Sequence, residues 1–106
     1  MRIVDYNVAG NMLQRARGIM FYKKNFKPLI FIFSRASVLQ STIHSFFCPP
    51  FDAVFLNENK EIIDLYEKVL PFKLSISPIK PAKYLIEAPE GFISKNNLKK
   101  GDFIEF

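Results

Sequence analysis

The sequence predicts a mainly β fold, an antiparallel β-sandwich or barrel-like single domain over residues 1–106 with one or two short helices. Two observations carry this prediction. Apolar segments rich in β-branched and aromatic residues are short and are bounded by Pro, Gly, Asn and Ser, as in Leu29–Phe33, Phe51–Leu56 and Tyr84–Ala88. Helix signals are few, and the chain length suits one domain.

The clearest helix signal lies between Asn11 and Gly18. Asn11 is a good N-cap, and Gln14 stands three residues later, as a capping box requires. Arg15 and Arg17 suit the negative end of the helix dipole, and Gly18 can end the helix in a left-handed turn. These residues predict a helix of two to three turns at most.

The remaining segments are assigned mainly to strands. A helix over Glu61–Val69 competes with the strand predicted there, and Pro71, Pro78 and Pro81 make Leu70–Ala82 an extended loop. The predicted strands are Arg2–Val8, Leu29–Phe33, Val38–Cys48, Phe51–Leu56, Ile62–Tyr66, Tyr84–Ala88 and Phe103–Phe106, with a short second helix over Phe92–Asn97.

Asp52 is a lone carboxylate in the apolar segment Phe51–Leu56, whose continuous hydrophobicity predicts burial on both faces of a sheet. A charge in such surroundings is costly unless it is paired or hydrogen-bonded. One interpretation is structural: Asp52 accepts backbone amides or pairs with Arg17. The other is functional: Asp52 is a pocket carboxylate that acts as an acid or base.

His44 and Cys48 are the only histidine and cysteine of the chain. His44 could orient a ligand or move a proton. On a strand, His44 and Cys48 would lie too far apart for direct contact, so a nucleophilic site of Cys48, His44 and Asp52 would require a bulge at Pro49-Pro50. Cys48 is interpreted as a small buried hydrophobic residue. Glu87 is expected to face outward. No metal-ligand spacing or Gly-rich phosphate loop is present, and no cofactor is predicted.

The formal charge of +5 favours an anionic or acidic partner only weakly. The densest basic stretch, Tyr22–Lys27, alternates aromatic and lysine residues and could bind nucleic acid or be a solvated loop. With one cysteine, no signal-peptide pattern and no apolar run that could span a bilayer, we expect a cytoplasmic protein outside the membrane.

Three segments resemble a known family. Arg15–Phe21 resembles the Arg-x-x-Gly-Leu-Met-Phe signature of the family called domain of unknown function 192, and Pro50–Asn57 resembles its Pro-Leu-Asp-Ile-x-Phe-Leu-Asp segment. Tyr84–Glu87, with Gly91 and Gly101-Asp102, resembles its closing strand, helix and turn. The chain departs from the family in lacking the Trp-Met pair before the second segment. The resemblance implies a small β-sandwich or barrel-like domain and no established activity.

The leading functional hypothesis is a non-catalytic module that binds a small molecule or a protein. Its pocket is expected near Arg17, His44, Phe46, Asp52 and Tyr84, because these polar and aromatic residues converge if the helix packs beside the central hairpin. An alternative is a small hydrolase or isomerase that uses Asp52 and His44 as acid and base. A third is weak nucleic-acid binding through Tyr22–Lys27.

Overall fold

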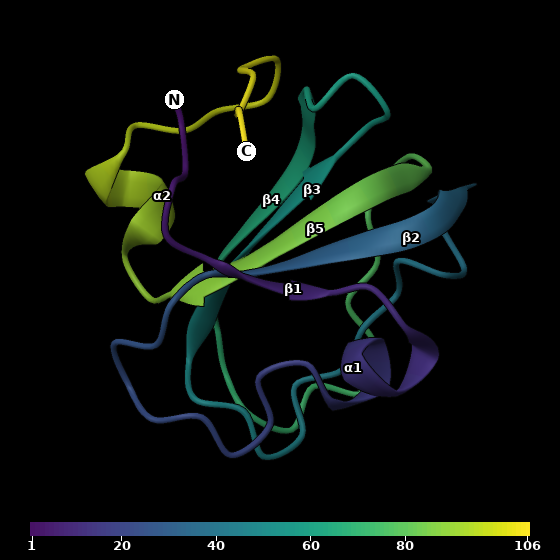
Figure 1. Ribbon diagram of the computed structural model, residues 1–106. Coiled ribbons are helices and arrows are strands. Elements are labelled where there is room, and N and C mark those ends of the chain that lie inside the picture. Colours follow the sequence, from purple (N-terminus) through teal and green to yellow (C-terminus); the bar gives the residue numbers. More distant parts are fainter.

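One five-stranded sheet organises the fold in the computed structural model, which describes residues 1–106 (Figure 1). Its elements are β1 (Asn7–Ala9), α1 (Met12–Arg17), β2 (Leu29–Ser37), β3 (Phe51–Leu56), β4 (Ile62–Val69), β5 (Ala82–Pro89) and α2 (Phe92–Lys95). The strand order is β1-β2-β5-β3-β4, and only the β1–β2 pair is parallel. The mainly β class with two short helices is confirmed; the sheet is open, so the barrel-like alternative is not observed.

Both faces of the sheet are covered, with α1 on one side and α2 on the other (Figure 1). Side chains of β3 alternate between two cores. Phe51, Ala53 and Phe55 share a core with Phe31, Phe33 and Leu85, whereas Val54 and Leu56 share the other with Ile30, Ile86 and Ile93. Every residue of β3 is buried, which confirms the predicted burial on both faces.

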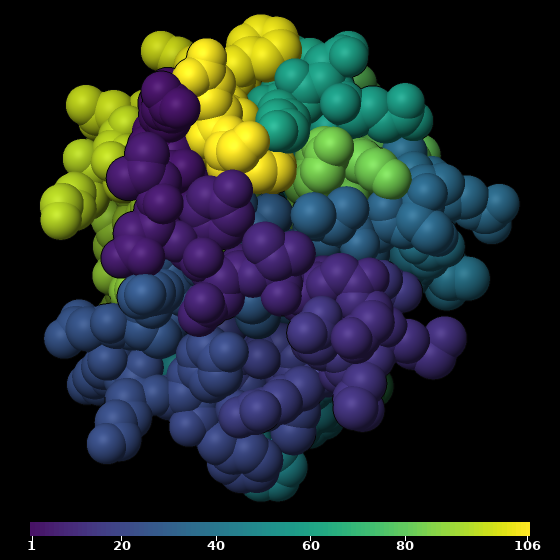
Figure 2. All heavy atoms as spheres, viewed as in Figure 1, coloured from purple at the N-terminus to yellow at the C-terminus, as the bar shows by residue number.

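The two ends of the chain lie side by side over the α2 face (Figure 2). Ile3 N donates to Glu105 O at 2.9 Å, and Glu105 N donates to Met1 O at 2.9 Å. Outside β1 these segments form only isolated bridges. The strand predicted at Arg2–Val8 is therefore confirmed only at Asn7 and Val8, which lie in β1, and the strand predicted at Phe103–Phe106 is wrong. Ile3 and Ile104 are buried in the core of that face. The C-terminal segment also pairs beside the start of the edge strand β4, since Phe103 bridges Glu61 and Ile62 N donates to Asp102 O at 2.8 Å.

The strand predicted over Val38–Cys48 is also wrong, because side-chain hydroxyls compete with sheet pairing there. Ser41 Oγ donates to the carbonyl of Ser37, and Thr42 Oγ1 donates to Val38 O at 2.7 Å. These bonds close turns, and only Ile43 makes a bridge, to Ile76. The segment therefore crosses the α1 face as a loop.

The other local predictions hold. In α1, Asn11 Oδ1 accepts from Gln14 N at 2.8 Å and Gln14 Oε1 accepts from Asn11 N at 3.3 Å, which completes the predicted capping box. The competing helix over Glu61–Val69 is absent, since β4 occupies Ile62–Val69. The second helix ends at Lys95, slightly earlier than predicted.

Asp52 joins three elements through backbone hydrogen bonds. Its side chain is 1% exposed; Oδ1 accepts from Lys68 N at 2.9 Å and Oδ2 accepts from Ile93 N at 2.8 Å. Lys68 lies near the end of β4 with a left-handed φ of 50°, and Ile93 is in the first turn of α2. The structural interpretation of Asp52 as an acceptor of backbone amides is confirmed, and Arg17 takes no part.

Replacing Asp52 by Ala should lower the free energy of unfolding by about 3–5 kcal/mol, because two charge-assisted bonds to buried amides are lost. Urea unfolding measures the loss. Asp5→Ala is the control, because that side chain is 73% exposed and pairs only with Lys27; it should cost less than about 1 kcal/mol. Equal losses in the two variants would contradict this role of Asp52.

Candidate functional site

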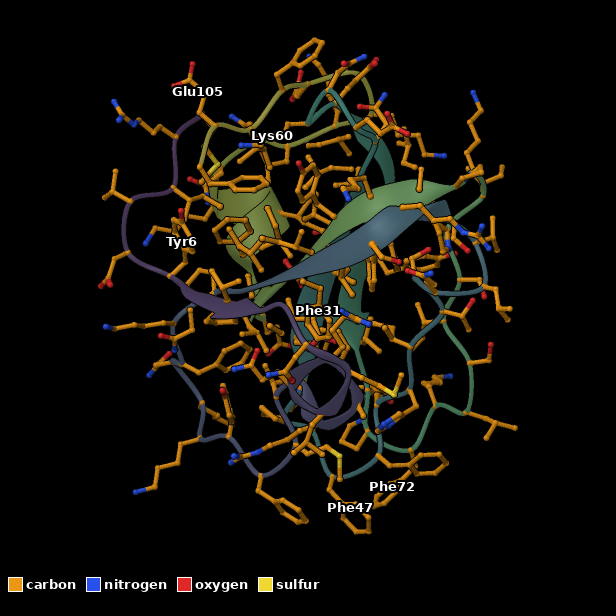
Figure 3. The ribbon with its side chains drawn as sticks, turned by 45° about the vertical axis from the view of Figure 1, so that its right-hand side comes forward. Tyr6, Phe31, Phe47, Lys60, Phe72 and Glu105 are labelled. Carbon is orange, nitrogen blue, oxygen red and sulfur yellow. The ribbon has the colours of Figure 1, made fainter.

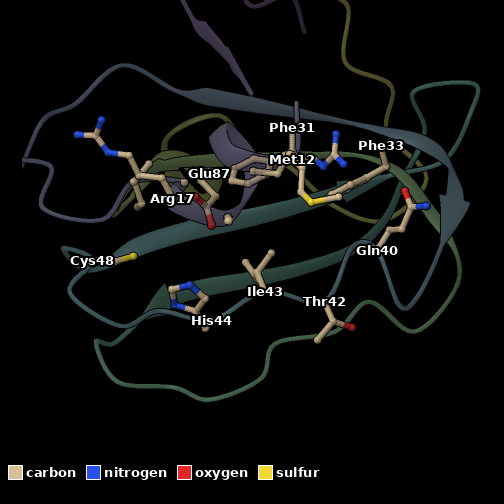
Figure 4. A pocket seen from close by; sticks show the side chains of 14 residues that line it. Met12, Arg17, Phe31, Phe33, Gln40, Thr42, Ile43, His44, Cys48 and Glu87 are labelled. Carbon is tan, nitrogen blue, oxygen red and sulfur yellow. The ribbon is translucent and has the colours of Figure 1, made fainter. Parts of the chain in front are cut away.

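A cavity of about 260 Å³ lies between α1 and the sheet, on the face opposite α2. Its walls come from α1 and the turn that follows, from β2, from the 40–48 loop and from β5 (Figure 4). The lining residues used below are Arg15, Arg17, Gly18, Ile19, Phe31, Phe33, Ile43, His44, Cys48 and Glu87. The capping box fixes the start of α1, and the loop at 38–48 supplies the cavity wall that faces this helix.

Glu87 is the only cavity residue with a buried unpartnered polar atom. It lies in the central strand β5, between Leu29 of β2 and Ala53 of β3. The side chain is 2% exposed, and Oε1 has no hydrogen-bond partner. In Figure 4 its carboxyl group points from the sheet toward His44 and Ile43 across the cavity. An unsatisfied buried carboxyl group is costly, so the position calls for a functional reason.

Burial raises the pKa of Glu87 to about 8, against the weaker opposite effect of the nearby Ile19 backbone amide. A carboxyl group with this pKa is largely protonated at neutral pH. It then offers one O–H donor, in addition to its acceptor oxygens, to anything in the cavity. The site therefore presents a neutral acid and not a fixed negative charge.

Cys48 lies at one end of the cavity and is unreactive in character. Burial, followed by the charge of Glu87, raises the pKa of its thiol to about 12, and Sγ donates to Phe46 O at 3.5 Å. A thiol with this pKa holds its proton at neutral pH and is a poor nucleophile. The interpretation of Cys48 as a buried hydrophobic residue is confirmed.

The mouth of the cavity is basic and polar. Arg15 Nη1 donates to Gly10 O at 2.7 Å, and the Arg17 guanidinium lies 5.9 Å from the centre of the Tyr22 ring. His44 is half-buried, and its Nδ1 accepts from Phe46 N at 3.1 Å, which leaves Nε2 available. No group of three His, Cys, Asp or Glu side chains is arranged to hold a metal ion.

The five residues predicted to share a pocket do not share one. Arg17 and His44 line the cavity, and the Phe46 ring lies 5.5 Å from His44. Asp52 lies on the other face of the sheet, bonded to α2, and Tyr84 packs there 5.2 Å from Phe106. The alternation of β3 and β5 side chains separates these two groups, so Asp52 and His44 cannot act on one substrate.

Glu87 was expected to face outward, and that prediction is wrong. β5 is a central strand with both faces covered, so a residue on either side of it is buried. The signal was present in the sequence, because Glu87 interrupts the apolar segment Leu85–Ala88 as Asp52 interrupts Phe51–Leu56. Glu87 is thus a lone carboxylate within an apolar segment in the same way as Asp52, and both are buried.

Gly18 allows the closest approach of α1 to Glu87. Its φ is +53°, and an added Cβ would lie 3.1 Å from both Glu87 Oε1 and Phe31 Cζ. A side chain here would be strained by the backbone and would also press against the carboxyl group. Glycine therefore maintains the contact between the turn and the buried acid.

Gly18→Ala should lower the free energy of unfolding by about 2–3 kcal/mol, from backbone strain together with the close contacts. Gly91→Ala is the matched control, since its φ is +96° and nothing lies within 4 Å of the added atom. Strain alone should cost that variant about 1–2 kcal/mol. The difference between the two variants in urea unfolding measures the combined contacts with Glu87 and Phe31, and no difference would contradict these contacts.

The titration of Glu87 should make stability fall with rising pH. The folded state holds the proton up to about pH 8, whereas an unfolded Glu releases it near 4.5. Its contribution to stability is therefore complete below about pH 4.5 and is lost as pH rises toward 8. Glu87→Gln removes this titration. The stability of the variant relative to the parent should rise by roughly 1 kcal/mol per pH unit between about pH 5 and 7.

Urea unfolding at several pH values measures this difference, and Glu67→Gln, on an exposed part of β4, is the control. A constant difference between Glu87→Gln and the parent across this range would show that Glu87 titrates normally.

Comparison with known proteins identifies the family of this chain. The sequence profile of domain of unknown function 192, described as "Uncharacterized ACR", matches residues 2–106. The chain belongs to this family. A UPF0127 protein of Pyrococcus furiosus is 33% identical over 104 residues, which cover 97% of this chain and 87% of the relative. A UPF0127 protein of Thermococcus sibiricus is 33% identical over 100 residues, and this chain covers 64% of its length.

A solved structure shares the fold of this domain of unknown function 192 chain. It is a protein of unknown function from Novosphingobium aromaticivorans, with a TM-score of 0.86 and 18% sequence identity, covering 95% of this chain and 74% of that one. The family resemblance seen in the sequence is confirmed. The family and the solved structure identify the fold and name no activity. None of the helices is long and apolar enough to cross a membrane.

Proposed function

We propose that this domain binds a small molecule in the cavity between α1 and the sheet, without catalysing its conversion. The observation that carries the proposal is the buried carboxyl group of Glu87, which lines the cavity and whose Oε1 has no hydrogen-bond partner. A ligand that fills the cavity would satisfy that atom, and a satisfied buried polar group no longer carries its desolvation cost.

The lining indicates the ligand class. Ile19, Phe31 and Phe33 supply apolar walls, protonated Glu87 supplies a donor, and Arg15 and Arg17 lie at the basic mouth. A carbonyl or carboxylate oxygen suits both the donor and the mouth, whereas an amine would face two cations. The volume of about 260 Å³ is below the usual range for drug-sized ligands, so the ligand is a small apolar compound with one acceptor group.

A thermal-shift screen tests the proposal with small aromatic and branched carboxylates, their amides and the matching amines. Carboxylates and amides should raise the melting temperature by several degrees at saturating concentration, and amines should not. Glu87→Leu should abolish the shift yet remain folded at neutral pH, because an apolar side chain of similar size replaces an unsatisfied one. Glu87→Gln keeps a donor and should retain part of it.

Glu67→Leu makes the same change on the exposed surface of β4 and should keep the full response. If no acid or amide stabilises the parent protein, or if Glu87→Leu responds like the parent, the cavity is not the binding site.

A second candidate is acid–base catalysis at the same cavity. A carboxyl group with a pKa of about 8 is well matched to proton transfer near neutral pH. This candidate replaces the Asp52–His44 pair, whose members lie on opposite faces. Conversion of any compound that binds, lost in Glu87→Gln while binding persists, would favour catalysis over binding alone.

A further inference from the structure

Three exposed phenylalanines project at one end of the molecule. Phe21, Phe47 and Phe72, together called the aromatic tip, are 72%, 54% and 64% exposed. Figure 3 shows Phe47 and Phe72 at the end opposite Lys60 and Glu105. Exposed large apolar patches mark interaction surfaces more often than single exposed residues do.

The three rings come from three separate turns and pack against one another. Phe21 stacks on Phe47 with ring centres 5.3 Å apart, and Phe72 meets Phe47 edge-on at 5.9 Å. The rings thus form one continuous apolar projection, although each keeps more than half of its surface open to solvent.

Hydrogen bonds between the turns hold the projection in place. Phe21 N donates to Phe47 O at 2.7 Å, and Phe72 N donates to Ser45 O at 3.2 Å. The buried Ser45 hydroxyl donates to Leu70 O at 2.7 Å and accepts from Lys73 N at 2.7 Å. The aromatic tip is therefore fixed before any partner arrives, which lowers the entropy lost on association.

All three phenylalanines have left-handed backbones, with φ of 65°, 59° and 67°. This conformation is strained for a bulky residue, and Gly or Asn would adopt it more easily. The chain thus carries strained, exposed, apolar residues at three neighbouring turns. Nothing in the packing of the fold requires rings at these positions, since none of the three is buried.

The chain around the aromatic tip is basic. Between Asp5 and Asp52 the sequence has no acidic residue and carries Arg15, Arg17, Lys23, Lys24, Lys27 and Arg35. Lys23 and Lys24 follow Phe21 closely, Lys73 follows Phe72 directly, and all three are exposed. Lys27 differs because it pairs with Asp5 at 3.2 Å. An apolar projection bordered by lysines suits a surface that is apolar inside and anionic outside.

We propose that the aromatic tip docks this domain on the surface of an anionic lipid bilayer. The rings insert at the boundary of headgroups and acyl chains, and Lys23, Lys24 and Lys73 contact lipid phosphates. The domain would adsorb on one leaflet without crossing the bilayer, and none of its helices is long and apolar enough to cross it. A second copy of the chain would bring basic surfaces together. Stacking of nucleobases is hindered because Phe21 and Phe47 already stack on each other.

Vesicle sedimentation of the full chain tests the proposal. The protein should bind vesicles of phosphatidylcholine with about a third phosphatidylglycerol, should bind pure phosphatidylcholine at least about tenfold more weakly, and should lose affinity with added salt. Phe47→Asn and Phe72→Asn should each lower the partition coefficient by about tenfold. Asn suits the left-handed backbone, so both variants should unfold at or above the parent's urea midpoint.

Phe103→Ser is the matched control, because Phe103 is 57% exposed and lies two residues before Glu105, which Figure 3 shows at the end opposite Phe47 and Phe72; its binding should not change. No sedimentation with anionic vesicles would overturn the proposal, as would binding that Phe47→Asn and Phe72→Asn leave intact. Self-association of the parent that these variants abolish, or variant-sensitive binding of single-stranded DNA without vesicle binding, would assign the tip to those partners instead. The outcome is independent of Glu87 and the cavity.

Discussion

The covering of both sheet faces is the constraint on which the rest of the structure depends. A strand such as β3 has no solvent side, so each polar side chain in it must find a partner within the protein or remain unsatisfied. Asp52 meets this demand by accepting amides from β4 and from α2. The carboxylate thereby fixes where α2 begins and how the backbone of β4 bends at Lys68, near the end of the strand.

Glu87 faces the same demand on the other side of the sheet and does not meet it. Asp52 and Glu87 lie on β3 and β5, which are paired neighbours, and both are almost fully buried. The Asp52 carboxylate uses both oxygens in hydrogen bonds to backbone amides of the fold. The Glu87 carboxyl group keeps an oxygen without a partner beside a cavity. This difference in hydrogen bonding, and not a difference in burial, separates a structural carboxylate from a candidate binding group.

Much of the fold could be predicted from local signals. The capping box at Asn11 and Gln14 is a contact within one helical turn, and the apolar run of β3 reports its burial directly. The 38–48 segment failed because hydroxyls of Ser41 and Thr42 bond to nearby carbonyls, an alternative that composition does not reveal. The candidate site was predicted only in part, and the reason differs from that for the 38–48 segment. Arg17 and His44 meet at the cavity, but which face Asp52 and Glu87 occupy depends on strand register and order, and these arise from long-range pairing.

The single cysteine makes local opening of the structure measurable by thiol modification. Cys48 is buried at the cavity wall with a pKa of about 12, so a thiol-specific reagent modifies it slowly unless the chain around it opens. The rate of modification in native buffer therefore reads the frequency of that opening. Comparing it with the rate of global unfolding distinguishes a local movement of the 45–48 turn from loss of the whole fold.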